Sequence, residues 1–191
     1  MPQYRRARLP GSVVFTTCVT YQRQPWFQTE TAIQLLRHAV AQTQKERPFE
    51  IVGAVILPEH LHFLWCLPDK DQDYSSRVGR MKVLFTRALQ KDNPVSDNVS
   101  LSRRKHRERD VWQRRFWERS LRDQAQVNHC LDYIHYNPVK HQLVSCPHAW
   151  PYSSFSRYVA RGMYSEFWGC QCQGRKPSVP DFSDLVDRVG E

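Results

Sequence analysis

Residues 49–67 read FEIVGAVILPEHLHFLWCL and contain two apolar runs separated by a Pro-Glu pair. The first run, residues 49–57, is almost continuously apolar, which is typical of a central strand buried on both faces. The second run, residues 60–67, is also strand-like. Two strands joined by so short a connection must be antiparallel. These residues therefore predict a mainly antiparallel sheet.

The rest of the chain supplies the other elements of this sheet and its helices. β-Branched and aromatic residues predict further strands at 13–20 and 116–122. Apolar residues at helical spacing predict helices at 29–46, 75–91 and 124–137, with a short helix near 152–160. Pro138 is expected to end the third helix, because proline disfavours the α conformation in the residue before it.

This order of elements predicts an α+β fold. It is a ferredoxin-like or RRM-like sandwich, with helices packed on one face of a mainly antiparallel sheet. The chain has 191 residues, which favours one domain. We assign residues 1–162 to that domain and residues 163–191 to a C-terminal tail.

The composition indicates a basic globular protein. Lysine and arginine number 28 and acidic residues 19, giving a net charge of +9, and the mean hydropathy is −0.66. These values exclude a membrane protein and a wholly disordered chain, and they predict a polyanionic partner, most often nucleic acid. No apolar segment follows the basic N-terminus, so we expect no signal peptide and a cytoplasmic protein. The expected nucleic-acid partner adds nucleoid association to this expectation.

The six cysteines are expected to be reduced thiols, because a chain of this length needs no disulfides and shows no export signal. Cys170 and Cys172 form a Cys-x-Cys pair. The sequence contains no second such pair to complete a zinc site, so a metal clip in the tail is only a weak hypothesis.

The strand at 60–67 carries a candidate metal site. Because alternate side chains share a face, His60 and His62 point away from the apolar face formed by Leu61, Phe63 and Trp65. Two imidazoles with Cα atoms about 7 Å apart can chelate one divalent ion. Two half-exposed strand histidines without a ligand are the alternative interpretation.

The third helix carries a second candidate group. Tyr133 and Asn137 are four residues apart, so they lie on one face, at the boundary of the apolar stripe. A rim tyrosine and a C-capping asparagine are the alternative. Taken with His60 and His62, however, a phenol and an amide supply the groups needed for metal-assisted attack on a phosphodiester.

A basic stretch precedes this helix. Residues 102–123 carry nine lysines and arginines against four acidic residues, a local excess of five positive charges. The aromatic residues between them could stack on bases or anchor the core. The candidate nucleic-acid contacts are Arg5, Arg6, Arg103, Arg104, Lys105, Arg107, Trp112, Arg114, Arg115 and Lys140.

Two motifs in combination, PEHLHFLW at 58–65 and DYIHYNPVKH at 132–141, resemble the REP-associated tyrosine transposases, which are single-tyrosine HUH endonucleases. The resemblance extends over residues 4 to about 164. One departure is Arg119, where many members of the family have histidine.

The resemblance implies that Tyr133 is the catalytic tyrosine and that His60, His62 and Asn137 bind Mg²⁺ or Mn²⁺. It implies an endonuclease and strand transferase that acts on single-stranded DNA hairpins of the REP type through a 5′-phosphotyrosine intermediate. We favour a monomer over a homodimer. A non-catalytic hairpin-binding protein and a zinc-stabilised RNA-binding domain, with zinc on His60, His62 and the cysteine pair, are the alternatives.

Overall fold

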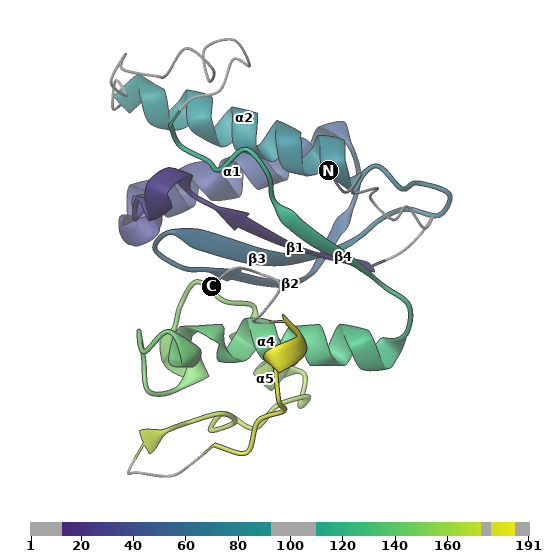
Figure 1. The fold of residues 1–191 in the computed structure, drawn as a ribbon, viewed down its shortest axis with the longest axis vertical. Coiled ribbons are helices and arrows are strands. Elements are labelled where there is room, and N and C mark those ends of the chain that lie inside the picture. Colours follow the sequence, from purple (N-terminus) through teal and green to yellow (C-terminus); the bar gives the residue numbers. More distant parts are fainter. Residues whose placement is uncertain (1–12, 93–109, 173–176, 186–191) are drawn as a thin grey trace.

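A computed structural model describes residues 13–92, 110–172 and 177–185, which form a four-stranded sheet covered by helices (Figure 1). Every strand pairing is antiparallel. The sheet order is β2-β3-β1-β4, which together with the β-α-β-β-α-β succession is a ferredoxin-like arrangement. The strands are β1 (Val13–Val19), β2 (Glu50–Ile56), β3 (His60–Cys66) and β4 (Trp117–Leu121). The predicted fold class is confirmed.

Helices cover both faces of the sheet, and not one face as expected (Figure 1). Helices α1 (Glu30–Glu46) and α2 (Tyr74–Asp92) lie on one face. Helix α4 (Gln124–Lys140) lies on the other, with α5 (Phe155–Ala160) close by. The physical reason is the alternation of side chains along β1 and β3. One set of apolar side chains faces α1 and α2, and the other faces α4. Each set must be shielded from water, so helices pack on both faces of the sheet.

Strand β2 lies at the edge of the sheet, so the expectation of a central strand is wrong. Its outer edge is paired by a later segment. Ile56 N donates to the Tyr152 carbonyl at 2.9 Å, and Ser154 N donates to the Ala54 carbonyl at 2.8 Å. The apolar run is explained because helices cover both faces and the chain near residue 153 covers the edge.

Helix α4 continues through Pro138 to Lys140, three residues beyond its predicted end. The proline is buried, and the carbonyls around it are satisfied from beyond the helix. His141 N donates to the Asn137 carbonyl, and Leu143 N donates to that of Pro138, each at 3.0 Å. Packing and these bonds offset the intrahelical hydrogen bond that proline cannot make.

Some of the described residues beyond 162 pack against α4. Phe182 and Leu185 are buried in the same apolar cluster as Leu131 and Ile134. The division of the chain at residue 162 stays a prediction.

Cys146 and Cys170 form a disulfide, so the expectation of six reduced thiols is wrong for this pair. Tertiary structure brings the two segments together, and Gln171 N donates to the Ser145 carbonyl at 2.8 Å. Among the described residues, no helix is long and apolar enough to cross a membrane.

Candidate functional site

The face of the sheet that packs on α4 holds both predicted histidines. His60 and His62 lie on β3, two residues apart, and both are completely buried. As predicted, Leu61, Phe63 and Trp65 pack in the opposite cluster, with α1 and α2. The two imidazole rings lie 5.0 Å apart between centroids.

Each imidazole is oriented by a hydrogen bond at Nδ1. His60 Nδ1 lies 3.0 Å from Glu59 Oε1, and His62 Nδ1 lies 2.8 Å from Thr17 Oγ1. The hydrogen bond with His60 lowers the pKa of the Glu59 carboxyl, although its burial acts in the opposite direction. Partners of this kind fix the ring and select Nε2 as the metal-binding atom.

Tyr133 extends from α4 to the histidines. Its ring centroid lies 5.4 Å from that of His62 and 6.0 Å from that of Phe15. Lys140 Nζ donates a hydrogen bond to the Tyr133 hydroxyl at 3.2 Å. An ammonium group at this distance stabilises the phenolate over the phenol.

Tyr133 is only 1% exposed, whereas the sequence placed it at a boundary. Phe182, from beyond residue 162, packs on its ring with centroids 5.5 Å apart. The same segment pairs Asp184 with Arg119 at 2.8 Å. Arg119, which stands where many members of the family have histidine, therefore contacts the C-terminal segment.

Asn137 lies one helical turn after Tyr133 and is completely buried. Within the described part of the chain, neither its Oδ1 nor its Nδ2 has a hydrogen-bond partner. A buried amide in this state costs about 1–3 kcal/mol for each polar group. A metal ion bound to Oδ1 would remove the part of this cost that belongs to the oxygen. Two imidazole nitrogens and an amide oxygen fit a divalent cation.

Sequence reasoning missed three neighbours of this site. Glu59 and Thr17 orient the histidines, and the His141 ring lies 5.0 Å from that of His60. The spacing of α4 could have indicated His141, which follows Asn137 by four residues. No sequence pattern indicates that Thr17 lies opposite His62, because this depends on the register in which β1 and β3 pair. His135 belongs to the core, and burial lowers its pKa to about 3, so it stays neutral.

Apart from Lys140, which contacts Tyr133, the predicted DNA contacts fall into three groups. Arg5, Arg6, Arg103, Arg104, Lys105 and Arg107 lie outside the described residues. Arg114 and Arg115 are exposed just before β4, and their contact with DNA stays a prediction. Trp112 is 6% exposed and packs against Phe27 and Phe85, as the core-anchor alternative expects, and its contact with DNA stays a prediction.

The zinc alternative named the wrong ligand set. His60 and His62 lie with Tyr133. Cys170 instead lies with Cys146 and His148.

Replacing Thr17 with valine tests whether the hydrogen bond at His62 Nδ1 supports metal binding. Valine has the same branching but no hydroxyl, so the imidazole loses its orienting partner. We expect a 10–100-fold weaker affinity for Mn²⁺, the usual cost of such a loss, measured by calorimetry. The matched control is Thr16→Val, because Thr16 lies beside it on the opposite face. An unchanged affinity in Thr17→Val would show that the hydrogen bond is not needed.

Three comparisons relate this chain to known proteins. A family model described as "Transposase IS200 like" matches residues 13–137. A protein of Haemophilus influenzae described as "Putative REP-associated tyrosine transposase" is 43% identical over 169 residues, which cover 88% of this chain and 94% of the relative. The REP-associated tyrosine transposase of Escherichia coli K12 is 40% identical over 168 residues, covering 88% and 91%.

A solved structure shows the same architecture. It is a REP-associated tyrosine transposase bound to a REP hairpin, and it aligns with a TM-score of 0.74 and 37% identity. The alignment covers 95% of this chain and 98% of the other. The likeness therefore extends over the sheet, α4 and the segments that follow.

Proposed function

The chain belongs to the IS200-like transposase family, as a REP-associated tyrosine transposase, and from this premise we propose that Tyr133 cleaves and rejoins single-stranded DNA at palindromic hairpins. The observation that carries the proposal is the placement of Tyr133, with its hydroxyl on Lys140 Nζ and its ring against His62. Hairpin DNA is supported as substrate by the similar transposase that was solved with a REP hairpin.

The proposed reaction is a transesterification. The Tyr133 oxygen attacks the phosphorus of a phosphodiester, and the bond from phosphorus to the 3′-oxygen breaks. The product is a 5′-phosphotyrosine. The tyrosine hydroxyl loses its proton to solvent, and the leaving oxygen takes one from solvent to become a 3′-hydroxyl. Attack on the phosphotyrosine by another 3′-hydroxyl reverses the step, releases Tyr133 and joins two strands.

Lys140 would lower the energetic cost of ionising the Tyr133 hydroxyl. Tyrosine has a pKa of about 10, so ionisation at pH 7 costs about 4 kcal/mol. The ammonium group of Lys140 offsets part of that cost by stabilising the phenolate. Lys140 is also a predicted DNA contact, and its hydrogen bond to the Tyr133 hydroxyl supports a role beside the nucleophile.

The residues His60, His62 and Asn137 would hold Mg²⁺ or Mn²⁺. Such an ion polarises the scissile phosphate and stabilises charge on the leaving oxygen. Two nitrogen donors favour Mn²⁺ over Mg²⁺ in affinity. We further propose that the protein acts in the cytoplasm at chromosomal DNA, and the expectation of a monomer stays a prediction.

The polarity of the covalent product tests the function. The probe is a single-stranded DNA hairpin selected from a pool by its binding to the protein, labelled at either end and incubated with Mn²⁺. On a denaturing gel we expect the 3′-labelled strand to stay on the protein and the 5′-labelled fragment to be released. A chelator is expected to abolish both signals.

Two outcomes would contradict the proposal. Release of both labelled fragments without an adduct would indicate hydrolysis by water. Binding without any cleavage would favour the non-catalytic hairpin-binding alternative.

A further inference from the structure

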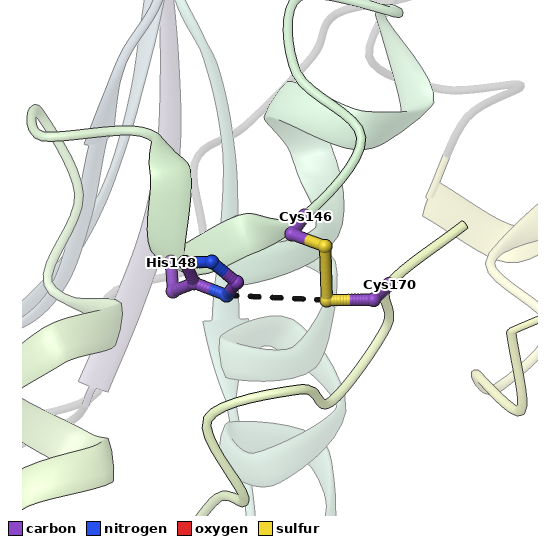
Figure 2. Close-up of side chains that lie close together, drawn as sticks. All are labelled: Cys146, His148 and Cys170. Carbon is purple, nitrogen blue, oxygen red and sulfur yellow. Dashed lines mark hydrogen bonds between the residues drawn. A yellow bond between two sulfur atoms is a disulfide. The ribbon is translucent and has the colours of Figure 1, made fainter. Parts of the chain in front are cut away.

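A group of metal-binding side chains lies outside the nuclease site. Cys146 directly precedes the short helix Pro147–Ala149, which carries His148, and Cys170 comes from a segment 24 residues later. One ligand atom of each residue lies within 4.8 Å of the others. Figure 2 shows the imidazole of His148 directed at the Cys170 sulfur. Cys146 is buried, Cys170 is half-buried and His148 is exposed, so an ion could enter from solvent.

A disulfide alone does not require the histidine. The bond joins Cys146 to Cys170, yet His148 Nδ1 lies 3.9 Å from Cys170 Sγ. In a tetrahedral zinc site, Zn–S bonds of about 2.3 Å and Zn–N bonds of about 2.0–2.1 Å separate a sulfur from a nitrogen ligand by about 3.6 Å. The histidine therefore already lies close to the position that zinc would require. Binding through Nδ1 would replace its present contact with the Glu166 carbonyl at 3.0 Å.

The neighbouring sequence supplies a fourth donor. Cys172 follows Cys170 by two residues, is exposed and is not in a disulfide. The chain thus contains Cys-x-His at 146–148 and Cys-x-Cys at 170–172, two pairs of donors on two adjacent segments. Cys172 lies outside the 4.8 Å group, so its sulfur would have to move closer to the other three donors to complete a four-ligand site.

We propose that in the reduced protein Cys146, His148, Cys170 and Cys172 bind one Zn²⁺ ion as a closed structural site. Two thiols of a cellular reductant supply two electrons and two protons to the disulfide and are themselves oxidised to a disulfide. The cysteine thiols then lose their protons to solvent as they bind the ion. In the oxidised protein the disulfide holds the same two segments together.

The site would fasten the C-terminal segment to the helix that carries Tyr133. Beside Cys170, Gln171 Nε2 donates to the Tyr136 hydroxyl at 2.7 Å, and Gln171 N donates to the Ser145 carbonyl. Ser145 lies just beyond the end of α4. Zinc at this point would hold the segment against the end of α4 when the disulfide is open.

Cobalt spectroscopy tests the site independently of nuclease activity. The full chain is reduced with dithiothreitol, freed of it by gel filtration under nitrogen, and titrated with Co²⁺. We expect a thiolate-to-cobalt charge-transfer band that saturates near one equivalent and disappears when Zn²⁺ is added. The nuclease site has only nitrogen and oxygen donors and gives no such band. Absence of the band in the reduced protein would overturn the proposal.

Four variants assign the ligands. Cys146→Ser and Cys170→Ser are expected to lose the band. His148→Ala and Cys172→Ser should weaken Zn²⁺ binding at least about 10-fold, measured by competition with a chromogenic chelator, since even outer-shell losses cost that much. His148 is exposed, so its removal carries little risk of unfolding. Unchanged affinity in His148→Ala would overturn the site, and unchanged affinity in Cys172→Ser would overturn the four-ligand assignment. Cys66→Ser, outside the group, is the control and should bind as the wild type does.

Discussion

Tyr133→Phe is expected to abolish the covalent DNA adduct while hairpin binding stays within about twofold of the wild type. The substitution removes one oxygen, which is the proposed nucleophile, and no other atom at the site can form the phosphotyrosine. Removal of a nucleophile in other enzymes costs up to about 10⁶-fold in rate. The phenyl ring keeps its contacts with Phe15, His62 and Phe182, so we expect a change in stability of only about 1 kcal/mol. The adduct is measured on a denaturing gel and the binding by fluorescence anisotropy.

The matched control is Tyr136→Phe. Tyr136 lies on the same helix, but its hydroxyl accepts a hydrogen bond from Gln171 Nε2 at 2.7 Å and its ring packs against Trp168. We expect adduct formation within about threefold of the wild type, because only one partly exposed hydrogen bond is lost. An adduct that persists in Tyr133→Phe and disappears in Tyr136→Phe would transfer the catalytic role to Tyr136.

Asn137→Leu is expected to change stability and activity in opposite directions. The metal-free protein buries both polar atoms of this amide without a hydrogen-bond partner among the described residues. Leucine has the same branching at Cγ and no polar atoms, so we expect the free energy of unfolding to rise by about 1–3 kcal/mol in the presence of a chelator. The same substitution removes the proposed oxygen ligand. Metal-dependent adduct formation should therefore fall at least about 100-fold, and urea denaturation and the adduct assay measure the two effects.

Two comparisons guard this result. Asn137→Ala removes the same polar atoms without adding volume. It therefore distinguishes the loss of the polar atoms from a steric effect of leucine. His60→Ala should also abolish the adduct but bring no such gain in stability, because its imidazole is held by Glu59. Loss of stability in both Asn137 variants would mean that the amide is satisfied in the folded protein, and the ligand assignment would be wrong.

Local patterns in the sequence predicted most of the fold. The bounds expected for β1, β3, α1 and β4 agree with the structure to within one residue at each end. The reason is that side-chain periodicity and turn residues report local backbone conformation directly. The alternation in residues 60–66 also placed His60 and His62 on the face opposite Leu61 and Phe63, as the structure confirms.

The predictions that were wrong or incomplete concern what surrounds these elements in the fold. The apolar run of β2 shows that the strand is buried, but it carries no information about what buries it, and the segment near Tyr152 covers its edge. Trp112 lies in a basic stretch, yet its ring is in the core. The type of a residue indicates whether it favours a buried or an exposed position, but it does not indicate which other residues it will contact in the fold.

The sequence by itself determined most of the secondary structure, the fold class and the residue types of the proposed site, because each depends on spacing within one element. Only the tertiary structure decided which residues from different elements meet. Thr17 pairs with His62 through the sheet register, Phe182 covers Tyr133, and Cys146 and His148 meet Cys170, which lies 24 and 22 residues after them. Such contacts depend on the packing of α4 and the C-terminal segment as a whole, and no local pattern of residues specifies them.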